Sequence, residues 1–164
     1  MNKIAIIGLP GSGKSTFALS LSKKLNLPVF YLDSYMFVQG TNGIKKDKKE
    51  FAKIEEALVD QEKWIIEGCS LSTLETRFQK ADLVIYLKPS RLTCIFRLFK
   101  RALFSKKILK GTGCYFGINL RIIKYLWTFE KEKGPSIYNL AKKYPQTKFR
   151  VIQSVEDLIF NDIL

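Results

Sequence analysis

Residues 3–16 read KIAIIGLPGSGKST, a short apolar run followed by a glycine-rich loop that ends in Lys14, Ser15 and Thr16. The segment from Gly8 to Ser15 fits the pattern G-x-x-x-x-G-K-[S/T] at every position. Glycines let the backbone curl so that its N–H groups converge on phosphate oxygens, and a helix beginning at the same point adds its positive N-terminus. This stretch therefore predicts a strand, a phosphate-binding loop and a helix in succession.

The residue types of this loop have expected roles in holding a nucleoside triphosphate. We expect Lys14 to reach the β- and γ-phosphates, Ser15 to ligate Mg²⁺ and Thr16 to lie near the α-phosphate. ATP and Mg²⁺ are accordingly the predicted cofactors. The residues predicted to bind the nucleotide are Gly8, Pro10, Gly11, Ser12, Gly13, Lys14, Ser15 and Thr16.

Apolar runs alternate with helical patterns along the rest of the chain. Strands are expected at 3–7, 28–32, 64–68, 82–87 and 148–152, helices at 14–25, 48–60, 71–79, 90–104, 118–133, 135–144 and after Ser154, and an irregular segment at 34–47. Strands that are apolar throughout and separated by helices indicate a parallel sheet covered on both faces. The predicted fold is therefore a doubly wound, five-stranded α/β domain that takes in residues 1–164.

Charged residues near the ends of the predicted strands are the next candidates, because ligands of such sheets bind at the carboxyl ends of the strands. Asp33 follows the second predicted strand and Glu67 lies in the third. We expect Asp33 to orient or deprotonate an acceptor hydroxyl and Glu67 to join Ser15 on the Mg²⁺ side, with a capping or loop role as the alternative for either carboxylate. Arg77, on the short predicted helix after Glu67, is a candidate clamp for an anionic group of the acceptor.

The positive charge is concentrated in one segment. From Arg91 to Arg150 the chain carries fifteen Lys and Arg against two acidic residues, which equals its whole net charge of +13. This indicates an anionic partner, namely a phosphorylated ligand, nucleic acid or an acidic membrane surface, with a solvated basic face as the alternative. Arg97 and Arg101 share one face of a predicted helix and are expected to stabilise a transferring phosphoryl group. Residues 102–119 are expected to form a lid over the nucleotide.

Composition excludes several classes of function. The chain has no histidine, which excludes Ser-His-Asp hydrolysis and HExxH metalloprotease chemistry. Its three cysteines, Cys69, Cys94 and Cys114, are irregularly spaced and indicate reduced thiols. No apolar run approaches the roughly 20 residues of a membrane span, and the N-terminal run is too short for a signal peptide. We therefore expect a soluble, cytoplasmic protein.

Further stretches make the chain resemble the small P-loop kinases often labelled topology modulation proteins, which are relatives of adenylate kinase. The matching stretches are LDSY (32–35), WIIEGCSLSTLETRFQKADLVIYL (64–87), PSR (89–91) and YLWTFEKEKGPSIYNL (125–140). The family's element W-I-I-D-G-N-Y appears at residues 64–70, with Glu67 in place of the aspartate. The resemblance implies a nucleoside-kinase type of fold and ATP as the donor. It also matches Asp33 to the family's acidic residue, and Arg97 and Arg101 to its lid arginines.

The expected function is Mg²⁺-dependent transfer of the ATP γ-phosphoryl group to a small acceptor. Adenylate kinases hold the acceptor's phosphate with an arginine in the region of residues 34–63, where this chain has none. The acceptor stays open between a nucleotide-like molecule and a hydroxylated metabolite. The alternative is a nucleic-acid-binding ATPase that affects DNA topology through the basic 91–150 segment. A third hypothesis is peripheral contact with anionic lipid through RLFKRALFSKKILK (97–110).

Overall fold

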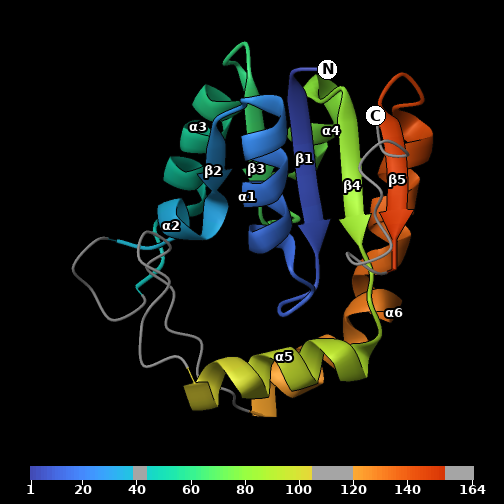
Figure 1. The fold of residues 1–164 in the computed structure, drawn as a ribbon. Helices are drawn as coiled ribbons and strands as arrows, with labels where there is room; N and C mark the ends of the chain where they lie inside the picture. The colour runs from blue at the N-terminus through green and yellow to red at the C-terminus, as the bar shows by residue number, and fades with distance from the viewer. Residues whose placement is uncertain (39–43, 105–119, 154–164) are drawn as a thin grey trace.

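The computed structural model describes residues 1–38, 44–104 and 120–153. Within these residues, parallel pairings join five strands into one sheet of order β2-β3-β1-β4-β5 (Figure 1). The strands are β1 (Lys3–Gly8), β2 (Val29–Tyr31), β3 (Trp64–Glu67), β4 (Leu83–Leu87) and β5 (Lys148–Ile152). The helices are α1 (Lys14–Leu25), α2 (Leu32–Met36), α3 (Lys48–Val59), α4 (Leu74–Lys80), α5 (Arg91–Phe104) and α6 (Leu120–Lys143). The prediction of a doubly wound parallel α/β fold is confirmed.

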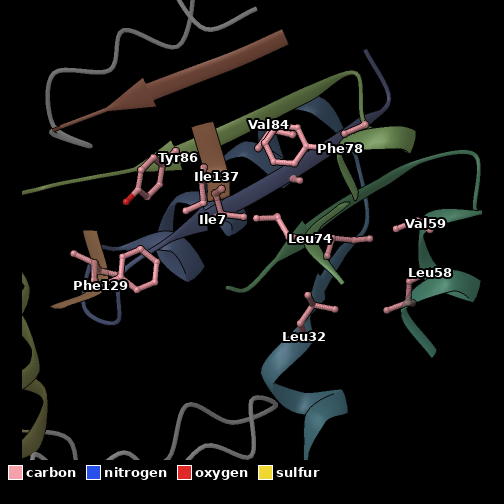
Figure 2. Packing of buried hydrophobic residues seen from close by; sticks show 14 of the residues in the cluster. Ile7, Leu32, Leu58, Val59, Leu74, Phe78, Val84, Tyr86, Phe129 and Ile137 are labelled. Carbon is pink, nitrogen blue, oxygen red and sulfur yellow. The ribbon is translucent and has the colours of Figure 1, made fainter. Parts of the chain in front are cut away.

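Two apolar clusters enclose the sheet, one on each face. Successive side chains of a strand point to opposite faces, so Ile4 and Ile6 of β1 pack toward α1 whereas Ala5 and Ile7 pack on the other side. Figure 1 shows α1 in front of the sheet with α3 and α4 behind it. Figure 2 shows the second cluster, in which the sheet meets the other helices through Leu32, Leu58, Val59, Leu74, Phe78, Val84, Tyr86, Phe129 and Ile137. The central strands are buried on both faces, which explains their continuous apolar sequences.

The carboxyl ends of the strands lie along one edge of the sheet. In Figure 1 this is the lower edge, and α5 runs across it. Strand β1 is central because it pairs with β3 on one side and with β4 on the other. The loop that follows β1 therefore emerges at the middle of this edge, beside the ends of β3 and β4.

The irregular segment expected at 34–47 is partly wrong. Residues 32–36 form the short helix α2 directly after β2. Leu32 is fully buried at its start, and the Ser34 hydroxyl donates to the Tyr31 carbonyl at 2.7 Å. Burial of Leu32 and this hydrogen bond of the Ser34 hydroxyl together stabilise the short helix α2, which the sequence pattern of the segment does not predict.

The predicted break at Gly134 and Pro135 is also wrong, because α6 continues through both residues. Phe129 and Ile137 lie on either side of the break and are both fully buried in the same cluster. Burying each side chain contributes about 1.5–3 kcal/mol, which offsets the cost of about 3 kcal/mol for a proline inside a helix.

The helix expected after Ser154 and residues 105–119 of the expected lid lie outside the described residues. No helix in the part of the chain that is described is long and apolar enough to cross a membrane.

Candidate phosphate-binding site

Glycine shapes the loop between β1 and α1. Gly11 and Gly13 have φ values of +77° and +94°, in the left-handed region where a side chain is strained. A Cβ atom on Gly11 would stand 2.6 Å from the Cys94 carbonyl oxygen of α5. The loop therefore packs directly on the α5 backbone. Gly13 occupies the N-cap of α1 and brings no side-chain oxygen to the first-turn N–H groups, which leaves them available to an anion.

Helix α1 and strand β3 bring Lys14, Ser15 and Glu67 together. The Lys14 ammonium donates to the Leu9 carbonyl at 2.8 Å and lies 3.8 Å from Glu67 Oε1. The Ser15 hydroxyl donates to Glu67 Oε2 at 3.1 Å. The two residues expected on the Mg²⁺ side are thus in contact, although 52 positions separate them in the sequence.

The surroundings of the Glu67 carboxyl group disfavour its ionised form. Burial raises its pKa above the ordinary value of 4.5, and the nearby charge of Asp33 raises it further, whereas Lys14 and the Ser15 hydroxyl act in the opposite direction. Burial raises the pKa of Tyr31 as well, assisted by the Glu67 charge opposite it in the strand register. A buried carboxylate beside a hydroxyl forms an oxygen donor set of the kind that Mg²⁺ prefers, so these residues fit that ion.

A cavity of about 440 Å³ lies between the start of α1 and the facing side of α5. This volume is within the usual range for small-molecule sites, about 300–1,000 Å³. Arg97 and Arg101 of α5 line this cavity together with Lys14, and Arg97 Nη1 donates to the Ser12 carbonyl at 3.2 Å. Of the sequence-predicted residues, the cavity is lined by Gly11, Gly13, Lys14, Ser15, Thr16, Arg97 and Arg101.

The other predicted residues lie around this cavity. Asp33 is in the first turn of α2, and its charge contributes to raising the pKa of Glu67 and of Cys69, after burial as the main cause for both. It therefore lies close to the Glu67 side of the site. Gly8, Pro10 and Ser12 belong to the loop and its approach, and Ser12 is fully buried there.

Arg77 differs from its expected position. The side chain is fully buried, and its Nε atom pairs with Glu55 Oε1 at 2.7 Å. Its Nη1 and Nη2 atoms donate to the carbonyls of Gly68 and Ser70 at 2.7 and 2.5 Å. A guanidinium surrounded in this way faces protein rather than an open acceptor pocket, so the structure argues against the expected clamp. Arg77 instead holds the turn that follows Glu67.

Two residues at or near the site, Tyr31 and Glu55, were not among the site residues predicted from the sequence. Tyr31 lines the cavity from the end of β2, where the rule for strand ends would have found it. Glu55 comes from α3 and is 1% exposed, with Thr73 donating to its carboxylate beside Arg77. The available signal was its position on the apolar face of that helix, four residues after Phe51 and three before Leu58.

This combination of parallel sheet, glycine-rich loop and Lys14–Ser15–Glu67 group defines the class as P-loop proteins with a kinase-like fold. Among families, the AAA domain family AAA_18 matches residues 4–112, more than half of the chain. The chain belongs to this family.

One named relative is similar to part of the chain. A Pyrococcus furiosus protein named "Putative adenylate kinase" is 31% identical over 105 residues, which are 64% of this chain and 58% of that protein. The chain thus spans less than two thirds of the length of that relative.

Solved structures of two shikimate kinases share the fold. The enzyme from Acinetobacter baumannii, in complex with shikimate, superposes with a TM-score of 0.62 at 14% identity over 94% of this chain and 84% of that one. The enzyme from Bacteroides thetaiotaomicron gives a TM-score of 0.58 at 17% identity over 93% and 86% of the two chains. At these identities the likeness concerns the fold alone.

Proposed function

We propose that the protein transfers the γ-phosphoryl group of ATP to an oxygen of a small acceptor, with Mg²⁺ as the metal ion. One observation carries this proposal: Lys14 and Ser15 contact Glu67 at the carboxyl edge of the sheet, and the same two residues line one cavity with Arg97 and Arg101. Phosphoryl transfer depends mainly on positioning and on stabilising negative charge, and this arrangement places cations on two sides of one space.

On the donor side, backbone N–H groups of residues 11–16 bind the phosphates, and the Lys14 ammonium moves from the Leu9 carbonyl to phosphate oxygens. Ser15 and Glu67 would hold Mg²⁺, which would supply positive charge against the phosphates. Arg97 and Arg101 stabilise the negative charge on the oxygens of the transferring group.

On the acceptor side, Asp33 orients an acceptor hydroxyl. The hydroxyl oxygen forms a bond to the γ-phosphorus while the bond from that phosphorus to the β–γ bridging oxygen breaks, so ADP leaves with the bonding electron pair. The hydroxyl proton passes to the Asp33 carboxylate and then to solvent. An acceptor that offers a phosphate oxygen needs no such proton transfer.

The names of the relatives suggest two acceptors to test first. One is adenylate, from the Pyrococcus relative, and the other is shikimate, from the structural neighbours. These acceptors differ in chemistry, because the first accepts through a phosphate oxygen and the second through a hydroxyl group.

The deciding experiment measures ADP production from Mg·ATP with a panel of acceptors: each nucleoside monophosphate, nucleosides, shikimate, other small hydroxylated metabolites and duplex DNA. We expect one small acceptor to raise the rate by orders of magnitude. Stimulation by DNA alone would contradict the proposal and favour the DNA-dependent ATPase.

A paired binding measurement tests the donor site without any acceptor. Lys14→Ala should abolish the thermal stabilisation by Mg·ATP, which a ligand gives in proportion to ln(1 + [ligand]/Kd). Lys23→Ala is the matched control, because Lys23 lies in the last turn of the same helix, away from the cavity. Unchanged ATP binding by the Lys14 variant would overturn the donor-site assignment.

A further inference from the structure

Helix α5 exposes an apolar face that the proposed phosphoryl transfer does not use. Leu92, Phe96, Phe99 and Leu103 have exposed fractions of 71, 69, 46 and 75%. Their spacing of four, three and four residues places them in one narrow stripe along the helix. We call these four side chains the α5 stripe. Four large apolar side chains at this exposure on a single helix face indicate an interaction surface.

The α5 stripe faces away from the cavity. Cys94 and Leu98 are buried, and the Cys94 carbonyl lies against Gly11 of the loop. Arg97 and Arg101 line the cavity on an adjoining part of the helix. At 100° per residue, the α5 stripe is centred almost opposite these inward residues. Its side chains therefore neither support the loop nor line the site.

Cationic and aromatic groups border the α5 stripe. Lys100 is exposed on α5, and the Arg91 guanidinium lies over the Trp127 ring of α6 at 5.3 Å from the ring centre. Trp127 is itself 56% exposed. An apolar stripe flanked by Lys, Arg and Trp is the composition of helices that lie in a membrane interface.

We propose that α5 docks on the surface of a membrane that carries anionic lipid, with the α5 stripe at the boundary between headgroups and acyl chains. Helix α5 has no acidic residue, and Arg91 and Lys100 flank its stripe, so this face complements an anionic surface. The same charge opposes pairing of two copies through this face, because like charges would meet. Nucleic acid would satisfy the charge but would leave Leu92 and Leu103 at the two ends of the α5 stripe without an apolar partner.

Co-sedimentation with vesicles tests this proposal. We expect the wild-type protein to pellet with vesicles of phosphatidylcholine and phosphatidylglycerol at low salt, and to stay in solution with phosphatidylcholine alone. The double variant Phe96→Ser, Leu103→Ser should lower the partition coefficient at least tenfold. Ile44→Ser is the matched control, because Ile44 is 61% exposed outside α5, and it should pellet like the wild type.

Fluorescence gives a second readout that needs no variant. Trp64 is fully buried, so a response of tryptophan emission to vesicles reports on Trp127. Emission should shift to the blue with anionic vesicles, and lipids brominated in the acyl chain should quench it.

The proposal would be overturned if the wild type failed to pellet with anionic vesicles at low salt, or if the double variant pelleted as well as the wild type. It would also be overturned if the wild type formed a dimer at high protein concentration and the double variant did not, because the α5 stripe would then bind a second copy of the chain. A weaker retention of the double variant on DNA without any vesicle binding would assign the surface to nucleic acid instead.

Discussion

Glu67 illustrates at the residue scale how stability and function oppose each other. Burial raises the pKa of its carboxyl group, which means that the folded protein favours the neutral form. The Lys14 ammonium lies 3.8 Å away and offsets this effect only in part. A bound cation would compensate the carboxylate, which is how a residue that is unfavourable for the fold becomes useful to the site.

Replacing Glu67 with glutamine should separate stability from activity. A raised folded-state pKa means that the stability contribution of Glu67 is fully present below the unfolded value and is lost as pH rises through the folded value. In the absence of Mg²⁺, Glu67→Gln should therefore melt above the wild type at neutral pH, and the difference should shrink as the pH falls toward 4.5. Phosphoryl transfer should fall about 10²-fold, since one of the oxygens proposed for Mg²⁺ loses its charge. A lower melting temperature of the variant at neutral pH would contradict this reading.

Arg77 and Glu55 form a second site of buried charge, with exposed fractions of 0 and 1%. Removing one partner of a buried pair leaves the other charge uncompensated and typically costs about 3–5 kcal/mol. Arg77→Met should lower the free energy of unfolding in urea by an amount of this order. Glu55→Gln should cost less, because burial raises the pKa of the Glu55 carboxyl despite the Arg77 charge and so already disfavours its ionised form. The double variant should lose clearly less than the sum of the two single losses. Strict additivity would show that the two side chains are not energetically coupled.

At the element scale, α5 connects three surfaces. Its Cys94 carbonyl contacts the loop at Gly11, its arginines line the cavity and its opposite face carries the α5 stripe. A displacement of this helix would change the loop and the cavity together. In helix α6 an internal proline is unfavourable, but the burial of apolar residues on both sides of it stabilises the continuous helix.

Replacing Pro135 with alanine should stabilise the protein. Pro135 is exposed, so its ring contributes little packing, and alanine restores a backbone N–H donor within α6. We expect the free energy of unfolding in urea to rise by about 1–3 kcal/mol, the upper figure being the usual cost of an internal proline. Ser136→Ala, at the next exposed position, serves as the control and should change stability by less than about 0.5 kcal/mol. A destabilised Pro135→Ala variant would mean that the helix geometry there depends on the proline.

At the scale of the whole molecule, the net charge of +13 dominates the electrostatics. Ion pairs such as Lys143–Glu75 and Lys80–Asp60 are solvent-exposed and contribute little each. The long-range term is therefore mutual repulsion among lysines and arginines, which opposes the compact state.

Moderate salt should accordingly raise the melting temperature. Sodium chloride at about 0.1 M reduces the Debye length to about 10 Å and screens repulsion between distant charges. We expect the melting temperature to rise by a few degrees between low and moderate salt, as followed by circular dichroism. A melting temperature that falls with added salt would show that the exposed ion pairs outweigh the repulsion.

The order of strands and helices was largely predictable from the sequence, because it depends on local patterns. Continuous apolar runs defined the five strands to within one or two residues, and glycine chemistry defined the loop from Gly8 to Ser15. The rule for strand ends also selected Glu67, and the structure places that carboxylate against Ser15.

Only the tertiary structure decided where side chains from distant segments meet. The sequence predicts Arg77 as an acceptor clamp, but α3 brings Glu55 against it. The Gly134–Pro135 pair likewise predicts a helix end, whereas Phe129 and Ile137 on either side of it pack in the same core. The α5 stripe is likewise visible only once the buried face of α5 is known. The physical reason is that backbone preferences and periodicity act over a few neighbouring residues, whereas burial, desolvation and charge pairing depend on segments that folding alone brings together.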